Sequence, residues 1–135
     1  MLYVAGLGCR RGCTLSLLRD LLLDSLQSHN LQPGDLLALA SSQHKQGEAA
    51  LQQLASEWQL PLYWLSAAQL APYDSRLTQH SLLSRQLTGS GGVAEASALA
   101  QAERLSGQRA ALLGPRRHNP SATCAIAAAP NLERP

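Results

Sequence analysis

The chain alternates short apolar runs with longer segments in which apolar residues recur every three or four positions. Short runs bounded by turn residues are typical of buried strands, and the three-to-four spacing is typical of helices that bury one face. The apolar runs predict five strands, at residues 2–7, 36–40, 62–65, 109–113 and 123–128. The helical spacing predicts helices at residues 15 to about 29, 45–58, 66–70 and 93–105, and a less regular pattern covers residues 76–86.

This order of strands and helices predicts an α/β fold. We expect a three-layer α/β/α sandwich around a mostly parallel five-stranded sheet. No helix separates the last two predicted strands, so we expect them to form one antiparallel pair at an edge of the sheet. A chain of 135 residues, 45% hydrophobic and without Phe, predicts a single domain over residues 1–129 with a core of small aliphatic side chains. Residues 130–135 are expected to form a flexible tail.

Charge and apolar run length exclude several classes of protein. The formal net charge of +2 is too small to indicate nucleic-acid binding, and the basic loop at residues 114–120 has no aromatic residues interleaved with it. No apolar run reaches the roughly 20 residues that a membrane-spanning helix needs. We find no signal-peptide pattern, and the odd number of cysteines, three, favours the reducing cytoplasm. We therefore expect a cytoplasmic protein that binds neither nucleic acid nor membrane.

A segment rich in glycine and arginine follows the first predicted strand and precedes the first helix. Glycine lets a backbone approach a ligand closely, and the amide groups before a helix favour negative charge. Two consecutive arginines add guanidinium groups that suit carboxylate or phosphate. We therefore expect an anion site in which the N–H groups of Gly8 and Gly12 bind one carboxylate. Its candidate ligand-binding residues are Gly6, Gly8, Cys9, Arg10, Arg11 and Gly12.

Other interpretations of this segment remain open. A dinucleotide-binding fingerprint would need its third glycine one residue earlier and an acidic residue after the second strand, where Ser41 and Ser42 stand. A thiol near a helix N-terminus and an arginine can be nucleophilic, but Cys9 and Cys13 are also small enough simply to fill a turn. A metal site would need two further ligands, so we predict no metal site and no resident cofactor.

Two further segments contribute candidate residues. Ser41, Ser42 and Lys45 follow the second predicted strand and are expected either to face the same crevice or to belong to a solvated helix face. A second glycine turn, at Gly91 and Gly92, opens a helix whose first turn contains Glu95. Glu95 is our candidate general base, although a carboxylate there also has a purely structural reason, since the helix dipole favours it. The basic loop is expected either to be solvated or to fold over an acidic ligand.

Several of these stretches together resemble the CobE/CbiG family of cobalamin biosynthesis, and in particular the C-terminal domain of CbiG. The similar stretches are residues 6–12, 40–41 with Lys45 and Glu48, 61–62, 92–99 and 124–127. Because the similarity begins at the first strand, the chain resembles the stand-alone CobE form.

The resemblance implies a ligand class. CbiG proteins open a lactone ring on a cobalt-corrin intermediate, and corrin rings carry many acetate and propionate side chains. It therefore implies a corrinoid ligand, with other cobalamin-pathway enzymes as partners. The protein is expected to act as a carrier or accessory factor, or as an enzyme that modifies the macrocycle. A lactone-opening hydrolase and a nucleotide-binding module are the alternatives.

Overall fold

A computed structural model of the chain describes residues 1–77 and 92–130. Its elements follow one another in the order strand, helix, strand, helix, strand before two short helical segments, a long helix and three further strands. Their bounds are β1 Leu2–Cys9, α1 Leu15–Gln27, η1 Pro33–Asp35, β2 Leu36–Ser42, η2 Gln43–Lys45, α2 Ala49–Trp58, β3 Leu62–Leu65, α3 Ala67–Leu70, η3 Ala71–Arg76, α5 Val93–Ser106, β4 Ala111–Leu112, β5 Arg117–His118 and β6 Ala122–Ala129.

Six strands of the described residues form one sheet, in the order β3-β2-β1-β6-β4, with β5 also paired to β6. β1, β2 and β3 are parallel, and β6 runs antiparallel to β1, β4 and β5. Five strands therefore share one direction and β6 opposes them, which confirms a mostly parallel sheet with an antiparallel pair at one edge. The sixth strand, β5, lies inside the predicted basic loop, where two exposed residues give no strand pattern.

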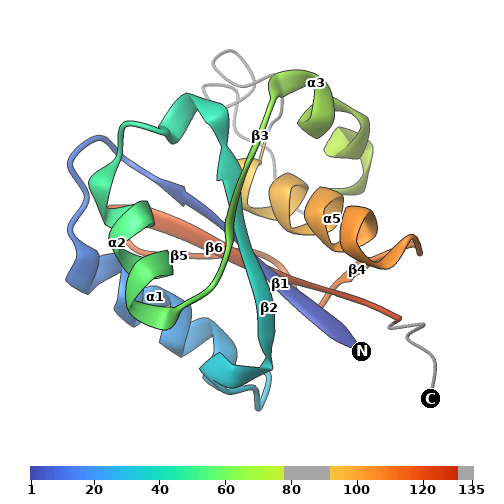
Figure 1. Cartoon of the computed structure of the whole chain (residues 1–135), viewed down its shortest axis with the longest axis horizontal. Coiled ribbons are helices and arrows are strands. Elements are labelled where there is room, and N and C mark those ends of the chain that lie inside the picture. Colours follow the sequence, from blue (N-terminus) through green and yellow to red (C-terminus); the bar gives the residue numbers. More distant parts are fainter. Residues whose placement is uncertain (78–91, 131–135) are drawn as a thin grey trace.

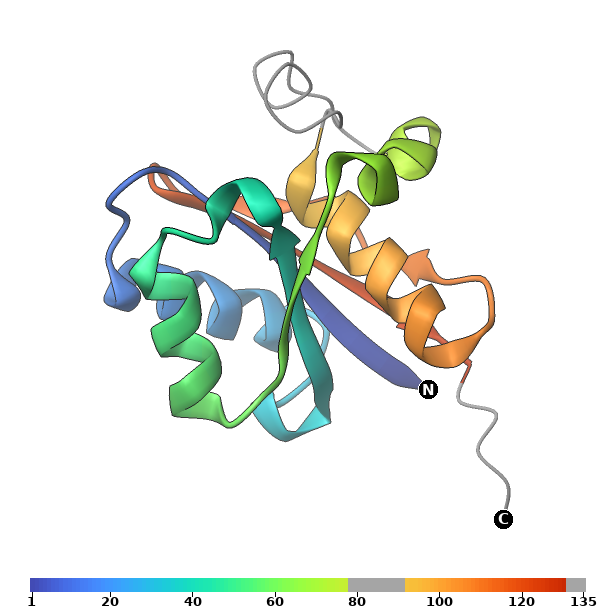
Figure 2. The same ribbon diagram turned by 45° about the horizontal axis from the view of Figure 1, so that its top comes forward.

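Helices cover both faces of the sheet, which confirms the predicted three layers (Figure 1). α1 and α2 pack on one face, and α5 with α3 packs on the other, as the rotated view also shows (Figure 2). Each face has its own apolar cluster, one centred on leucines of α1 and α2 and the other on alanines of α5. The central strands are thus buried on both faces, as continuous apolar runs predict.

Side chains of β1 alternate between these two clusters. Leu7 and Cys9 face α1 and α2, whereas Val4 faces α5. Gly6 belongs to the α5 face, where a Cβ atom would lie only 1.9 Å from the carbonyl oxygen of Ala94. Glycine at this position therefore lets the backbone of α5 approach the sheet closely.

Element boundaries differ from the prediction where local side chains end a pattern. Thr14 caps α1, because its Oγ1 accepts the N–H of Leu17 at 3.2 Å. The second predicted helix starts later, at Ala49, because residues 43–45 form a separate 3₁₀ turn. β2 extends to Ser42, beyond the predicted end. The predicted helix at 76–86 lies outside the described residues from position 78 onward, as does the tail from position 131.

A network centred on Glu103 fastens η3 to α5 and β4. The Glu103 carboxylate accepts hydrogen bonds from the hydroxyl of Tyr73, from Arg76 and from the N–H of Ala110, each at 2.9 Å. Burial alone would raise the pKa of Glu103, but these hydrogen bonds and the charge of Arg76 outweigh it and lower the pKa. The network therefore anchors the last described turn before position 78.

The three cysteines differ in access to solvent. Cys9 and Cys124 are buried in the cluster beneath α1, whereas Cys13 is half-buried at its margin. Burial raises the pKa of both buried thiols, in Cys124 to about 12, and the neighbouring Cys13 raises that of Cys9 further. A buried thiol with a raised pKa is a poor nucleophile, so Cys9 is a core residue and not an activated thiol.

Replacing Gly6 by alanine tests the close approach of α5. We expect Gly6→Ala to lower the free energy of unfolding by about 3 kcal/mol, because the new methyl group would displace the backbone of α5. Gly47→Ala is the matched control, since a Cβ at Gly47 meets nothing within 4 Å. Urea unfolding measures both, and equal midpoints for the two variants would contradict the packing argument.

Alkylation tests the burial of the thiols. At about pH 8, iodoacetamide should label Cys13 in the native protein and leave Cys9 and Cys124 unmodified, because the thiolate is the reacting form. Unfolding in urea should expose all three cysteines to the reagent. Mass spectrometry of tryptic peptides distinguishes the sites, and labelling of Cys9 as fast as that of Cys13 would refute this assignment.

Candidate functional site

The carboxyl ends of the three parallel strands meet at one edge of the sheet. β1 ends at Cys9, β2 at Ser42 and β3 at Leu65. β6 runs the other way and begins at this edge, where Ala122 pairs with Cys9. In open α/β sheets ligands bind outside this edge, so the fold places most of the predicted site residues where a ligand is expected.

The turn after β1 is built by a backbone hydrogen bond and a glycine. The N–H of Cys13 donates to the carbonyl of Arg10 at 3.0 Å, which closes a four-residue turn. Gly12 takes a φ of +75°, in the left-handed region that favours glycine. The N–H of Arg10 in turn donates to the carbonyl of Ser121 at 2.8 Å. The turn is therefore held against the start of β6.

A carboxylate already contacts this turn. The N–H of Gly12 donates to Oε1 of Glu48 at 2.7 Å, although the two residues are 36 positions apart. The backbone of Glu48 lies at the start of α2, so this hydrogen bond ties the turn after β1 to the helix after β2. The N–H of Glu48 also donates to the carbonyl of Lys45 at 3.0 Å.

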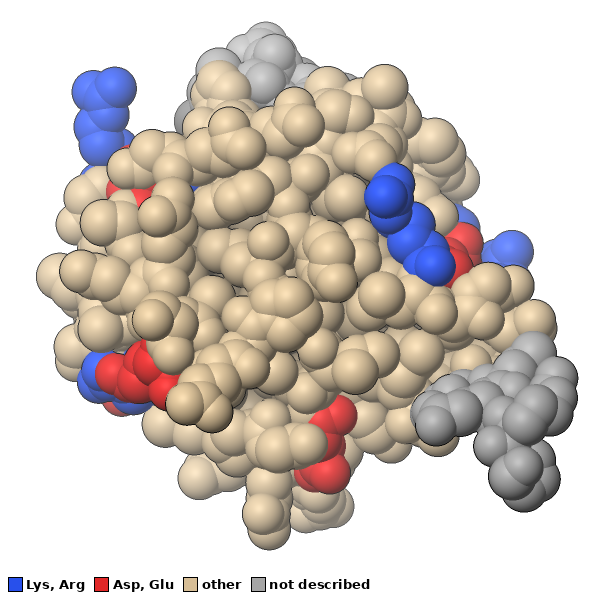
Figure 3. Space-filling view, in the orientation of Figure 1, with Lys and Arg blue, Asp and Glu red and all other residues tan. Residues whose placement is uncertain are grey.

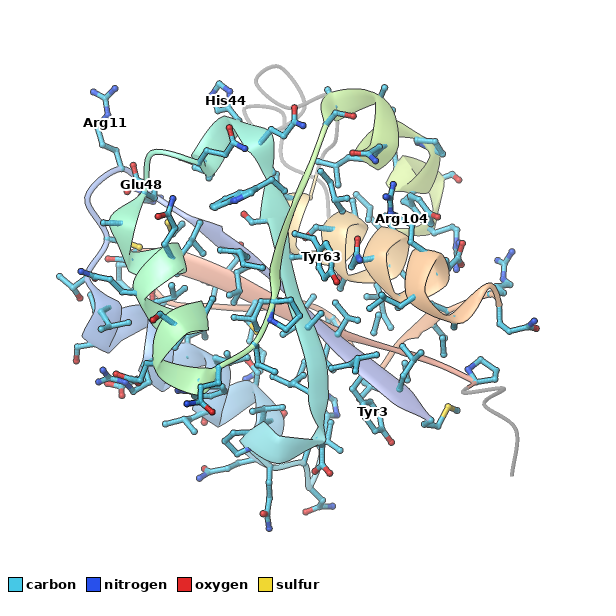
Figure 4. The ribbon with its side chains drawn as sticks, viewed as in Figure 1. Tyr3, Arg11, His44, Glu48, Tyr63 and Arg104 are labelled. Atoms are coloured by element: carbon cyan, nitrogen blue, oxygen red, sulfur yellow. The ribbon has the colours of Figure 1, made fainter. Side chains whose placement is uncertain are left out.

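The basic side chains of this edge are exposed or half-buried. Arg10 and Arg11 are exposed, and Lys45 is half-buried. Figure 4 shows Arg11 extending from the corner of the molecule, with Glu48 nearer the body. Figure 3 shows a basic side chain projecting from the same corner. These cations are therefore available to a ligand that approaches from solvent.

Gly8, which lies beyond the end of the first predicted strand, is inside β1, as is Gly6. Both belong to the α5 side of the strand: Gly8 also approaches Val93, and a Cβ there would lie 2.6 Å from Oγ1 of Thr123. β1 is two residues longer than predicted because β6 pairs with it along its whole length. The two glycines therefore serve packing between the strands and α5.

The two serines at the end of β2 use their hydroxyl groups within the chain. Ser41 is fully buried, and its hydroxyl donates to the carbonyl of Leu7 at 2.6 Å. The hydroxyl of Ser42 accepts the N–H of His44 at 3.1 Å and so caps η2. The prediction that Ser41 donates to a ligand is wrong in this structure, because its hydroxyl group already donates to the carbonyl of Leu7 in β1.

Glu95 lies in the first turn of α5, as predicted, but it is fully buried. Its Oε2 accepts the N–H of Arg116 at 3.1 Å, so the segment between β4 and β5 is fastened to the start of α5. Gly92 is the N-cap of this helix, and Gly91 lies outside the described residues. The carboxylate of Glu95 thus faces the protein interior.

The basic loop folds back onto the protein. Arg117 forms an ion pair with Asp24 of α1 at 2.7 Å, and the side chain of Asn119 donates to the carbonyl of Leu17 at 3.1 Å. Asn119 also accepts the N–H groups of Ser121 and Ala122. Asn119 was not among the predicted site residues, although Asn before Pro is a turn signal that points to such a role.

An open cavity of about 400 Å³ lies at the opposite edge of the sheet, near the start of β2 and the end of α2. Its lining residues are Arg19, Leu23, Pro33, Gly34, Leu36, Trp58 and Leu60. None of them belongs to the predicted site, so the apolar hollow and the basic edge are separate features.

The described residues 1–77 and 92–130 contain no group of three His, Cys, Asp or Glu side chains that could hold a metal ion. Among the same residues, no helix combines the length and apolar character that a membrane crossing requires.

Comparison with known proteins gives a consistent result. Residues 3–127 match the family described as Cobalamin synthesis G C-terminus. Over 124 residues the chain is 33% identical to Protein CobE of a Sinorhizobium species, which covers 92% of this chain and 78% of that protein. It is 36% identical over 90 residues to cobalt-precorrin-5A hydrolase of Salmonella typhimurium, covering 67% of this chain. The aligned part is 25% of that hydrolase, so the chain spans about a quarter of its length.

Two solved structures have the same fold. The crystal structure of CobE, a protein from the cobalamin (vitamin B12) biosynthetic pathway, superposes with a TM-score of 0.90 at 45% identity, covering 93% of this chain and 89% of that one. The cobalamin biosynthesis protein chiG from Agrobacterium tumefaciens superposes with a TM-score of 0.69 at 29% identity, covering 93% and 97%. The family match and these relatives confirm the resemblance found in the sequence: the chain belongs to the cobalamin biosynthesis family defined by the C-terminal region of CbiG, which includes CobE.

Proposed function

We propose that this protein binds a corrin-ring intermediate of cobalamin synthesis at the carboxyl edge of its sheet, as a carrier or accessory factor. One observation supports the proposal above all: a backbone amide in the turn after β1, that of Gly12, holds a carboxylate at 2.7 Å beside Arg10 and Arg11. A family that works on corrin rings supplies a ligand with several such carboxylates.

The chemistry of the ligand suits this edge. Corrin intermediates carry acetate and propionate arms that are ionised near neutral pH. Arginine guanidinium groups bind carboxylates through two parallel hydrogen bonds, and such charge-assisted bonds are stronger than neutral ones. Arg10, Arg11 and the half-buried Lys45 together offer three cations at one end of the sheet. In this proposal each cation pairs with a different arm of the ring.

A binding role is supported better than catalysis by Glu95. A general base must reach the proton that it removes, and Glu95 is fully buried under the segment that contains Arg116. We therefore assign Glu95 a positioning role, in which it fixes that segment beside the site.

A hydrolase is the second candidate, because the chain is 36% identical to part of the Salmonella hydrolase. Incubation of the purified protein with a corrin lactone intermediate separates the two. An opened lactone with a released aldehyde would indicate an enzyme, and unchanged ligand bound to the protein would indicate a carrier.

A nucleotide-binding module has less support. In a dinucleotide fingerprint the first glycines form the turn between strand and helix, where the backbone approaches the pyrophosphate. Here Gly6 and Gly8 lie inside β1 and pack against α5.

Removing the arginine pair tests the proposal. We expect the double variant Arg10→Ala, Arg11→Ala to bind cobyrinic acid, a corrinoid with seven free carboxyl groups, at least tenfold more weakly, which corresponds to about 1.4 kcal/mol. Isothermal titration calorimetry measures the affinity. The heptamethyl ester of the same corrinoid should bind much more weakly to the unaltered protein, since it lacks the charges.

A matched control removes two charges elsewhere. Arg104 and Arg109 are exposed near the other end of α5, so Arg104→Ala with Arg109→Ala lowers the net charge by the same amount. This control should bind cobyrinic acid with nearly unaltered affinity. An equal loss of affinity in both double variants would show that binding depends on net charge alone and not on the arginine pair. If the unaltered protein does not bind cobyrinic acid, the proposal is refuted.

A further inference from the structure

We infer that the amide of Gly12 is a carboxylate subsite of the ligand, and that Glu48 fills this subsite until a carboxylate arm of the ligand displaces it. The inference rests on the proposed function and specifies it further, because it assigns one arm of the ligand to one backbone group. Glu48 would then act as a placeholder that competes with the ligand.

The hydrogen bond from Gly12 to Glu48 supports this inference by its geometry. The distance of 2.7 Å between the Gly12 nitrogen and Oε1 of Glu48 falls in the range of charge-assisted hydrogen bonds. Nothing in the local sequence requires the bond, since its partners come from separate connections of the sheet. The turn thus binds a carboxylate with good geometry, whichever molecule the carboxylate belongs to.

The turn that contains Gly12 is accessible from solvent. Gly12 is exposed, and a Cβ atom built on it would meet nothing within 4 Å, so open space adjoins the turn. Its φ of +75° is set by the turn and does not depend on Glu48 being present, because the closing bond runs between Arg10 and Cys13. A carboxylate from solvent can therefore reach the amide once the side chain of Glu48 rotates away.

Basic residues belong to both connections that the bond between Gly12 and Glu48 joins. Arg10 and Arg11 precede Gly12 directly, and Lys45 lies in η2, three residues before Glu48. In the described part of the chain, Glu48 forms no ion pair with these cations, so its carboxylate is held by the amide of Gly12. The two connections that this bond joins thus contain three cations and one carboxylate, which leaves an excess of positive charge for further anionic groups.

Competition by Glu48 would lower the measured affinity for the ligand. A ligand whose site is partly occupied binds with an apparent affinity reduced by the fraction of protein in which the site is open. We therefore expect Glu48→Ala to bind cobyrinic acid about tenfold more tightly than the unaltered protein does. Glu48→Gln should fall between them, because its amide oxygen still accepts the N–H of Gly12 while its charge is gone.

Comparing Glu48→Ala with Glu48→Gln separates the effect of vacating the Gly12 amide from the effect of removing a negative charge. Both remove one negative charge, so a purely electrostatic gain would be the same for the two. Asp20→Ala is the control for net charge, since Asp20 is exposed on α1; it should change the affinity by less than about twofold. Weaker binding by a folded Glu48→Ala protein, or equal gains in the Ala and Gln variants, would overturn the inference.

A second experiment does not depend on a corrinoid. The amide resonance of Gly12 in ¹⁵N-labelled Glu48→Ala protein should shift saturably as acetate is added, because acetate enters the vacated subsite. In the unaltered protein the same resonance should remain constant. No shift in the variant would overturn the subsite. Failure of the unaltered protein and the Glu48→Ala variant to bind cobyrinic acid, together with a clear acetate shift, would refute the corrinoid function and leave the subsite established.

Discussion

The close contact between β1 and α5 determines how the sheet, the helices and the carboxyl edge are arranged. A helix backbone can approach the middle of a buried strand only where side chains are absent, and Gly6 provides that position beneath Ala94. α5 also presents small residues to the sheet: five of its alanines, between positions 94 and 102, are buried. The dense packing fixes the start of α5 at the carboxyl edge of the sheet. It also buries Glu95, whose carboxylate then holds Arg116 and the segment that leads to β5.

The same edge gathers groups from three separate connections. Because β1 and β2 are parallel neighbours, the turn after β1 and the 3₁₀ turn after β2 emerge side by side. That adjacency brings Glu48 to the amide of Gly12, and Arg10, Arg11 and Lys45 belong to the same two connections. The antiparallel β6 begins at this edge and supports the turn through the carbonyl of Ser121. Rigid strands thus position a short turn whose exposed amide and cations suit carboxylates.

Most of the fold could be predicted from the sequence because the apolar periodicity is strong. The strands β1, β2, β3 and β6 and the helices α1 and α5 lie where the pattern puts them, within a few residues. β5 could not be predicted, since Arg117 and His118 owe their extended form to pairing with β6 and not to their own pattern. Of the candidate site, the turn after β1 and its exposed arginines followed from residue types, and the binding of a ligand carboxylate there stays a prediction. Two hydrogen bonds could not be predicted, because each joins residues more than 30 positions apart. They run from the N–H of Gly12 to Glu48 and from the hydroxyl of Ser41 to the carbonyl of Leu7.

In the proposed function an acidic corrinoid binds at the carboxyl edge of the sheet. The most direct test is a map of amide chemical-shift changes in ¹⁵N-labelled protein titrated with cobyrinic acid. We expect the largest changes at Arg11, Gly12 and Lys45, with little change around the cavity at the other edge. Changes concentrated at Trp58 and Leu60, which line that cavity, would show that the corrinoid binds there and not at the carboxyl edge.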